Sequence, residues 1–194
     1  MKIIPIILIS YLIGSIPFGY ILYYLKYKED IRTKGSGNPG GTNVFREGGA
    51  LLGILTTLLD ISKAFIPVVI AKRYFGFSDI LFMVWLSVVI GHMFSIFLRF
   101  KGGKGVAATF GGVLGIDYRI FLILVIVYLS IIILTKISSI GSLISGVILL
   151  ISYYSLYGGK HIIFVIIIVL FVFLRHKENI KRILAGKEKK VVKK

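Results

Sequence analysis

Two glycine-rich stretches of the chain combine the residue types that bind phosphate. Residues 34–49 read KGSGNPGGTNVFREGG, and residues 91–115 read GHMFSIFLRFKGGKGVAATFGGVLG. Glycine allows positive φ and a close approach of the backbone to a ligand, and successive N–H groups in such turns form an anion-binding concavity. We therefore expect loops that hold phosphoryl groups.

The first stretch adds neutral donors and a guanidinium to its glycines. An arginine fork matches phosphate oxygens in pairs, and hydroxyl and amide groups supply further hydrogen bonds. The candidate residues here are Gly35, Ser36, Gly37, Asn38, Gly40, Gly41, Thr42, Asn43 and Arg46.

The second stretch places a lysine on each side of a glycine pair. Its candidates are Lys101, Gly102, Gly103, Lys104 and Gly105, with each lysine acting as a point charge. A Walker-type nucleotide loop is excluded, because Leu98 stands where its first glycine belongs and Gly105 follows the lysine. Gly-Gly and Asn-Pro pairs also mark plain turns. Two such loops with cations and donors favour a shared anion site over that alternative.

Residues 175–182, RHKENIKR, are a third candidate segment. His176 and Asn179 are three residues apart, and Arg175, Asn179 and Arg182 recur at helical spacing, so each set lies near one face of a helix. The alternative is a basic helix that rests on anionic lipid. That alternative suits residues 187–194 but explains neither His176 nor Asn179.

Other polar residues fall inside apolar segments. Asp60 and Lys63, one helical turn apart, either form a structural ion pair or have a catalytic role, and we favour the ion pair. His92 is expected to have a packing or loop-positioning role. Ser139 and Ser142 either bond the backbone or line the site.

The elements that must position these residues are apolar. The 194-residue chain is 57% hydrophobic with a mean hydropathy of +0.93, which exceeds what a soluble surface allows. Runs of about 20 apolar residues cross a bilayer as helices. There are seven apolar segments, of which the fourth, fifth and seventh are shorter than this: 3–25, 50–75, 80–97, 106–116, 120–134, 137–157 and 162–174. We expect an all-α integral membrane protein with seven transmembrane helices, some short or broken. Gly111 and Gly112 mark the fourth segment as broken or half-buried, and the seventh should continue to Ala185 and stop at Gly186.

Positive charge predicts the orientation. With seven crossings, 18 of the 24 lysines and arginines fall on one side and five on the other, with Lys63 inside a span. The richer side is expected to be cytoplasmic. The N-terminus then lies outside, and the C-terminus and both glycine loops lie in the cytoplasm. We expect one membrane-embedded domain over residues 1–186 and a basic cytoplasmic tail over residues 187–194.

Four motifs resemble one known family. GSGNPGGTNVFR at 35–46, GHMFSIFLRFKGGKGVAA at 91–108 and RHKENIKRILAGKE at 175–188 look like signatures of the bacterial acyl-phosphate:glycerol-3-phosphate acyltransferases. KISSIGS at 136–142 is similar to a fourth signature, more loosely, and leaves Ser138 and Ser139 as alternatives. Pro39 departs from the usual pattern and stiffens the first loop.

The resemblance implies a reaction and its participants. An acyl group passes from acyl phosphate to the sn-1 hydroxyl of glycerol 3-phosphate, giving lysophosphatidic acid and phosphate. The site would face the cytoplasm of a bacterial inner membrane, receive acyl phosphate from a soluble partner enzyme, and need no cofactor, metal or nucleic acid. Ser36, Arg46, Lys104, His176 and Asn179 would be catalytic. The remaining loop residues named above, with Ser139 and Ser142, would bind substrate.

The chemistry expected of this set is positioning. Acyl phosphate is already activated, so catalysis can rest on alignment and charge stabilisation. The His-four-residues-Asp pattern of other glycerol phosphate acyltransferases is absent, since Phe97, Ile166 and Lys181 follow the three histidines at that distance. The proton would pass to a substrate phosphate oxygen or to His176.

Two other function classes remain as alternatives. A transporter of small phosphorylated anions would also use basic loops and short spans, although the two halves show no inverted repeat. A membrane scaffold without activity would not need polar donors concentrated in glycine loops. A lipid enzyme of the CDP-alcohol type is excluded, because its multi-aspartate motif is missing.

Overall fold

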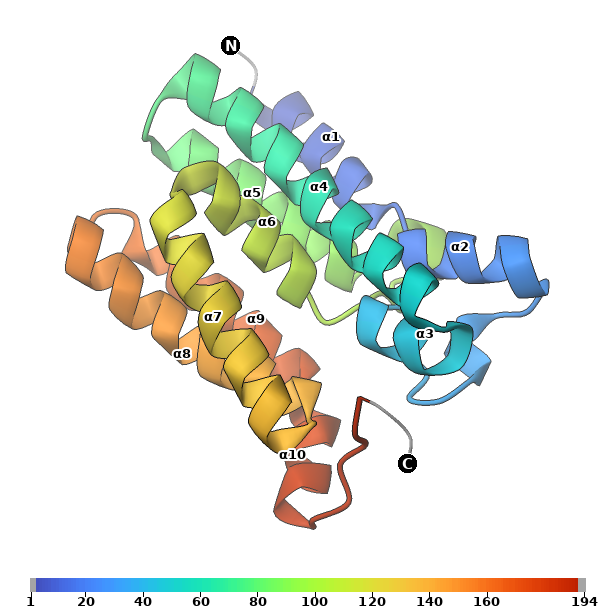
Figure 1. Ribbon diagram of the computed structural model, residues 1–194. Coiled ribbons are helices and arrows are strands. Elements are labelled where there is room, and N and C mark those ends of the chain that lie inside the picture. The colour runs from blue at the N-terminus through green and yellow to red at the C-terminus, as the bar shows by residue number, and fades with distance from the viewer. Residues whose placement is uncertain (1–2, 192–194) are drawn as a thin grey trace. The chain divides into compact units, whose positions relative to one another are not determined.

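The computed structural model describes residues 3–191, and every regular element in that range is a helix (Figure 1). The expectation of an all-α protein is confirmed. The chain forms two compact units, Met1–Ile116 and Asp117–Lys194. Lys2, Lys193 and Lys194, which entered the charge count, lie outside the described residues, as does the end of the expected basic tail.

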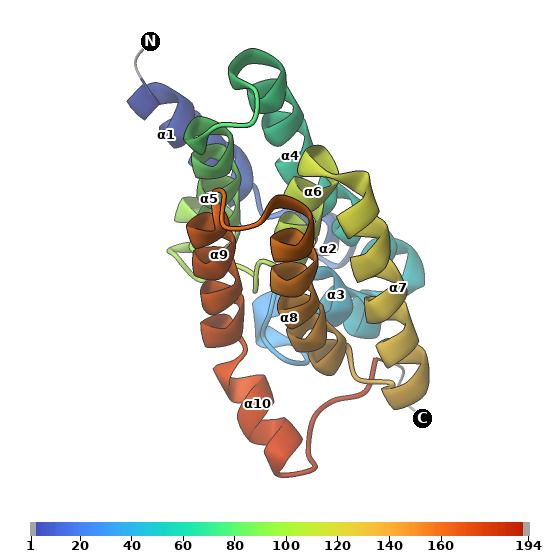
Figure 2. The same ribbon diagram turned by 90° about the vertical axis from the view of Figure 1, so that its left-hand side faces the viewer.

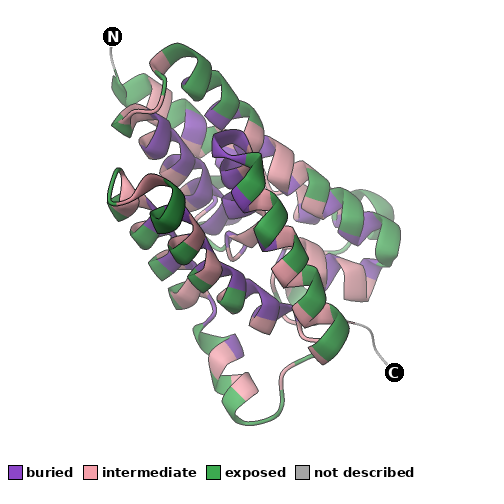
Figure 3. Ribbon diagram, turned by 60° about the vertical axis from the view of Figure 1, so that its left-hand side comes forward, coloured by how far each residue is buried: buried purple, intermediate pink, exposed green. Residues whose placement is uncertain are grey.

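All seven predicted apolar segments are helical. Among residues 3–191, five helical segments are long and apolar enough to cross a bilayer, and the first and third of them each contain an internal break. They are Ile3–Tyr27, Ala50–Phe75, Asp79–Leu98, Tyr118–Thr135 and Ser138–Tyr157. Val106–Ile116 and Ile162–Arg175 are apolar but shorter, as their sequences indicated. Figure 3 shows exposed residues beside buried ones on most helices, and many of the exposed residues are leucine or isoleucine, the residues expected against lipid.

The helices of the first unit pack closely against one another (Figure 1). Its helices are α1 (Ile3–Ser15), α2 (Phe18–Tyr27), α3 (Gly41–Gly48), α4 (Ala50–Phe75), α5 (Asp79–Met93) and α6 (Val106–Ile116), with short 3-10 turns at Ile31–Thr33 and Ile96–Leu98. Helix α5 lies along α1, and α6 lies along α4. A Cβ on Gly111 would be 2.1 Å from the carbonyl oxygen of Ile61, and one on Gly112 would be 2.0 Å from the Trp85 ring. The two glycines therefore permit close helix packing, and α6 is largely buried and unbroken.

The first apolar segment is broken, contrary to the expected single helix. Helix α1 ends at Ser15 and α2 begins at Phe18. Pro17 lies at the break, where it supplies no backbone N–H and cannot continue the helix. The Ile16 carbonyl instead accepts a hydrogen bond of 2.6 Å from Lys63 Nζ. Packing within the unit thus satisfies a carbonyl group that the helix leaves open.

The second unit contains α7 (Tyr118–Thr135), α8 (Ser138–Tyr157), α9 (Ile162–Arg175) and α10 (Lys177–Leu184). Helices α7 and α9 each lie along α8 (Figure 2). The expected continuous helix to Ala185 is wrong, because it breaks at His176 (φ −98°, ψ 6°). The His176 amide bonds the carbonyls of Val172 and Phe173, which tightens the turn there. Gly186, with φ +65°, follows α10 as predicted.

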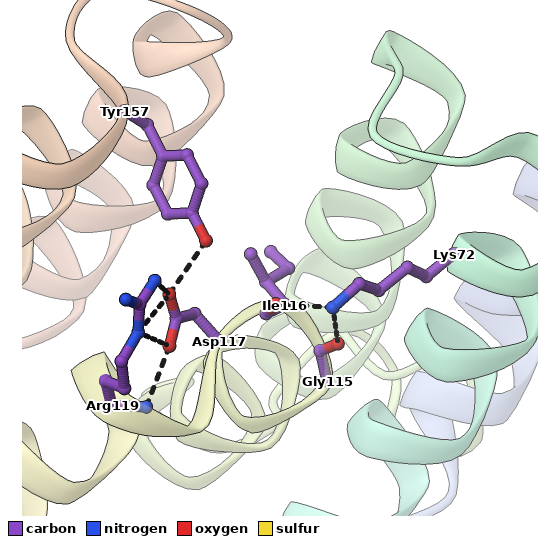
Figure 4. Close-up of polar contacts among 6 residues, drawn as sticks. All are labelled: Lys72, Gly115, Ile116, Asp117, Arg119 and Tyr157. Carbon is purple, nitrogen blue, oxygen red and sulfur yellow. Dashed lines mark hydrogen bonds and ion pairs between the residues drawn. The ribbon is translucent and has the colours of Figure 1, made fainter.

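Charged side chains close two helix ends, one in each unit (Figure 4). In the first unit Lys72 Nζ donates to the carbonyls of Gly115 and Ile116 at the end of α6, at 3.4 and 2.7 Å. A cation at a helix C-terminus is favourable because it satisfies open carbonyls and meets the negative end of the dipole.

In the second unit the Asp117 carboxylate caps the start of α7. It accepts from the Arg119 amide at 2.8 Å, from the Arg119 guanidinium at 2.7 Å and from Tyr157 Oη at 2.7 Å. The side chain is 4% exposed. The hydrogen bonds from Arg119 outweigh the effect of burial and hold the pKa of Asp117 well below its usual range.

Replacing this carboxylate should destabilise the protein. We expect Asp117→Asn to lower the free energy of unfolding by about 1.5–3 kcal/mol, the range for lost hydrogen bonds to a charged group. Because the pKa of Asp117 is lower in the folded protein, this stabilisation is fully present above the unfolded-state pKa of about 3.9. It is lost only as the pH falls towards the folded-state pKa. Thermal unfolding in detergent should therefore show the same deficit at pH 6 and pH 8. Glu178→Gln, which removes an exposed pair with Lys181, is the matched control and should change little.

Candidate active site

The first glycine loop leads directly into a helix that its sequence did not predict. Asn38 Oδ1 accepts from the Gly40 amide at 2.8 Å, and α3 begins at Gly41. The loop therefore ends at the N-terminus of α3, where the positive end of the helix dipole favours an anion. The abundance of glycine in GGTNVFREGG concealed this helix.

Asn43 shapes the loop from within. Its side chain is buried, with Oδ1 accepting from the Ser36 amide at 2.9 Å and Nδ2 donating to the Lys34 carbonyl at 3.1 Å. These contacts give Asn43 a role in loop geometry beside the expected one in binding. Gly35 and Gly37 take positive φ of +57° and +72°, as glycine at these positions suggested.

Ser36 and Arg46 lie together at this loop. An Arg46 Nη atom donates to Ser36 Oγ at 3.4 Å, and both side chains are partly exposed. A guanidinium and a hydroxyl on the same side of a glycine loop can bind a phosphoryl group in concert.

The second glycine loop is held against the end of α5. The Gly102 amide donates to the Met93 carbonyl at 3.1 Å, and the Gly103 amide donates to the His92 carbonyl at 3.0 Å. These two amides therefore cap helix carbonyls, which is a different use from the expected anion contact. Gly105 has φ +87° and opens into α6, so Lys104 stands at a helix N-terminus.

Parts of the two glycine loops lie close together within the first unit. Arg32 forms an ion pair of 2.6 Å with Asp30 and donates to the Leu98 carbonyl at 3.3 Å, which ties the two loop regions. A small cavity is lined by residues of both loops, among them Pro39, Gly102 and Gly103. The hydrogen bond from Arg32 lowers the pKa of Asp30 despite partial burial. Sequence reasoning had assigned no role to this pair.

The ion pair expected inside the second span is present. Lys63 Nζ lies 2.7 Å from Asp60 Oδ1, and both side chains are 3% exposed. His92 Nδ1 lies 3.5 Å from the same carboxylate oxygen. The cluster borders the cavity between the loops.

In the second unit Ser139, Asn179 and Arg182 meet at Glu188, which sequence reasoning missed. Glu188 Oε1 accepts from Ser139 Oγ at 3.0 Å and from Asn179 Nδ2, and Oε2 accepts from Arg182 Nε at 2.7 Å. Burial raises the pKa of this carboxyl, but the three donors outweigh it and the net shift is downward. A glutamate among tail lysines gave no sign of such a partner set.

The other candidate residues of the second unit bond groups of their own or a neighbouring helix. Ser142 Oγ donates to the Ser138 carbonyl at 3.0 Å, which agrees with the backbone alternative, and Ser138 Oγ bonds Tyr128 Oη at 2.8 Å. His176 is buried, and its Nδ1 lies 2.7 Å from the Val172 carbonyl. That carbonyl requires a proton on Nδ1, so Nε2 is the acceptor of the neutral ring.

Known proteins are similar to this chain over almost its whole length. The family model described as glycerol-3-phosphate acyltransferase matches residues 4–186. The glycerol-3-phosphate acyltransferase of Ehrlichia canis (strain Jake) is 41% identical over 186 residues, covering 96% of this chain and 97% of that protein. The enzyme of that name from Pelagibacter ubique (strain HTCC1062) is 42% identical over 190 residues, covering 98% of each.

A solved structure gives the same result. It is the crystal structure of PlsY (YgiH), an integral membrane glycerol 3-phosphate acyltransferase, in its glycerol 3-phosphate form. It aligns with a TM-score of 0.94 at 36% identity, over 98% of this chain and 96% of that one. The lysophosphatidic acid form aligns with a TM-score of 0.90 at 35% identity. The chain belongs to the glycerol-3-phosphate acyltransferase family of integral membrane proteins.

Proposed function

We propose that this protein transfers a fatty acyl group from acyl phosphate to the sn-1 hydroxyl of glycerol 3-phosphate. The observation that carries the proposal is the pair of adjacent glycine loops in the first unit. Each loop opens into a helix N-terminus, and between them they supply Ser36, Arg46 and Lys104. This chemistry suits phosphoryl groups, and both substrates carry one. The solved relative has forms named for glycerol 3-phosphate and lysophosphatidic acid, which agree with this acceptor and product.

The reaction is a direct transfer. The sn-1 oxygen bonds the acyl carbon, the bond from that carbon to the phosphate oxygen breaks, and the hydroxyl proton passes to a phosphate oxygen or to His176 Nε2. The products are lysophosphatidic acid and phosphate. Arg46 and Lys104 stabilise the negative charge that develops on the leaving phosphate and the carbonyl oxygen.

The other expected residues have supporting roles. Asn179 and His176 orient glycerol 3-phosphate, while Ser139 and Ser142 complete the binding surface. The loop residues Gly35, Gly37, Asn38, Gly40, Gly41, Thr42, Asn43, Lys101, Gly102, Gly103 and Gly105 shape or line the phosphate sites. In this proposal both units belong to one membrane-embedded domain over residues 1–186, and residues 187–194 form a basic tail that is attached to the second unit through Glu188.

The topology follows from the charge distribution. Seven crossings place the loops and the C-terminus in the cytoplasm and the N-terminus outside. In a bacterial inner membrane the site then receives acyl phosphate from the soluble enzyme that makes it, while the acyl chain remains in lipid.

The test is donor choice by the purified protein in lipid. Glycerol 3-phosphate is offered with acyl phosphate, acyl-CoA or acyl carrier protein, and lysophosphatidic acid is followed. We expect product with acyl phosphate alone. Product from either thioester would contradict the donor assignment. Uptake of labelled glycerol 3-phosphate into vesicles without any lipid product would instead support a transporter.

A further inference from the structure

A buried charged cluster in the first unit has no part in the proposed reaction. Asp60 and Lys63 come from α4 and His92 from α5, and their side chains are 3%, 3% and 7% exposed. Ionisable groups inside membrane-spanning helices are costly and generally serve a purpose. A structural role accounts for Lys63, because its ammonium donates to the Ile16 carbonyl that the helix break at Pro17 leaves open. It explains neither Asp60 nor His92.

His92 connects the cluster to the second glycine loop. One side of its ring lies at Asp60, with Nδ1 3.5 Å from the carboxylate. The other side lies against Gly103, where an added Cβ would be 2.1 Å from Nε2. The His92 carbonyl also accepts the Gly103 amide at 3.0 Å. Both the ring and the backbone of His92 therefore fix Gly103, the residue directly before Lys104.

The position of His92 is itself fixed from several elements. Asp60 lies beside its ring, Lys63 neutralises Asp60, and Lys63 is tied to the α1–α2 break through Ile16. A Cβ on Gly102 would be 2.2 Å from the His92 carbonyl oxygen, so the loop has no room to move closer. The cavity beside the cluster is shared with Pro39 of the first loop.

We propose that Asp60, Lys63 and His92 are positioning residues, which set the height and direction of the Lys101–Gly105 loop so that Lys104 meets a phosphoryl group. The inference rests on the proposed function and adds residues that do not touch substrate. Lys63 and Asp60 hold the imidazole, the imidazole holds Gly103, and Gly103 places Lys104 at the start of α6.

The first test replaces the imidazole. His92→Phe keeps a planar ring but removes both nitrogens. We expect a folded protein whose kcat/KM falls about 100-fold, as for a reacting group displaced by about 1 Å. The fall should include a higher KM for one of the two phosphorylated substrates together with a lower kcat, because Lys104 both binds a phosphoryl group and stabilises the charge that develops on it. Asp60→Asn should show a smaller change of the same kind. Ser62→Ala is the matched control, since Ser62 lies beside Lys63 on α4 but bonds only the Leu58 carbonyl of its own helix.

The second test uses the contact between ring and glycine. Gly103→Ala should raise the same KM, because its Cβ meets the ring. In the double variant His92→Ala/Gly103→Ala the ring is gone, so the added methyl group has room. The rise in KM should then be smaller than the product of the rises in the two single variants. A multiplicative result would overturn the proposal.

Other outcomes are equally decisive. Unchanged KM values in His92→Phe and Asp60→Asn would overturn the positioning role. This holds also if the two variants lose thermal stability while their KM values stay at the wild-type level. If His92→Phe does not accumulate, His92→Gln takes its place, and wild-type KM values in that variant count against the proposal. Wild-type protein that makes no lysophosphatidic acid would instead refute the proposed function.

Discussion

Lys104→Ala should reduce kcat/KM by about 1,000-fold while leaving the folded protein in the membrane. Lys104 stands where the second glycine loop enters α6, and its side chain is partly exposed. The helix N-terminus and the ammonium act on the same developing negative charge, so alanine removes the larger share of that stabilisation. Steady-state formation of lysophosphatidic acid by the purified variant measures the effect.

Arg99→Ala is the matched control for the lysine variant. Arg99 is an exposed cation just before the same loop, and the proposed machinery does not include it. Its activity should remain near the wild-type value. Near-normal turnover in both Lys104→Ala and Arg46→Ala would contradict the proposed phosphate clamp.

Glu188→Ala should cost about 3 kcal/mol of unfolding free energy, the lower end of the range for removing one partner of a buried ion pair. The side chain of Glu188 is 4% exposed and that of Arg182 is 34% exposed, so Arg182 recovers some solvation when the carboxylate is lost. Ser139 and Asn179 lose their acceptor at the same time. Activity should fall as well, because Asn179 is no longer held in position. Thermal or denaturant unfolding in detergent measures the stability, and product formation measures the activity.

Lys187→Ala is the neighbouring control. Lys187 is exposed, and a surface substitution of this kind should change stability by less than about 0.5 kcal/mol. If Glu188→Ala unfolds like the wild-type protein, the three donors around the carboxylate do not stabilise the second unit.

The apolar helices were predictable because the bilayer imposes a strong and local constraint. A backbone in hydrocarbon must satisfy its own hydrogen bonds, so length and hydropathy alone locate the segments. Breaks within them depend on weaker signals. Pro17 indicated one of these breaks, but the long apolar run around it led to the prediction of a single helix. The break at His176 has no signal in sequence, since it arises from contacts with Val172 and Phe173.

The glycine loops were recognisable from composition, but the use of each amide was not. Glycine can expose N–H groups to a ligand or allow close packing, and both choices have the same sequence. Gly102 and Gly103 serve close packing. Their amides donate to carbonyls at the end of α5, which have no partner within the helix. Glu188 was missed for a related reason. Its partners Ser139 and Asn179 are 49 and 9 residues away, and only the fold of the second unit brings them together.

The central claim is that two phosphorylated substrates are held at the same time and react directly. Isothermal titration tests it with glycerol 3-phosphate and a long-chain analogue of acyl phosphate in which CH2 replaces the bridging oxygen, so that no transfer occurs. We predict that glycerol 3-phosphate binds with one-to-one stoichiometry to protein already saturated with the analogue. Mutually exclusive binding of the two compounds would contradict the account.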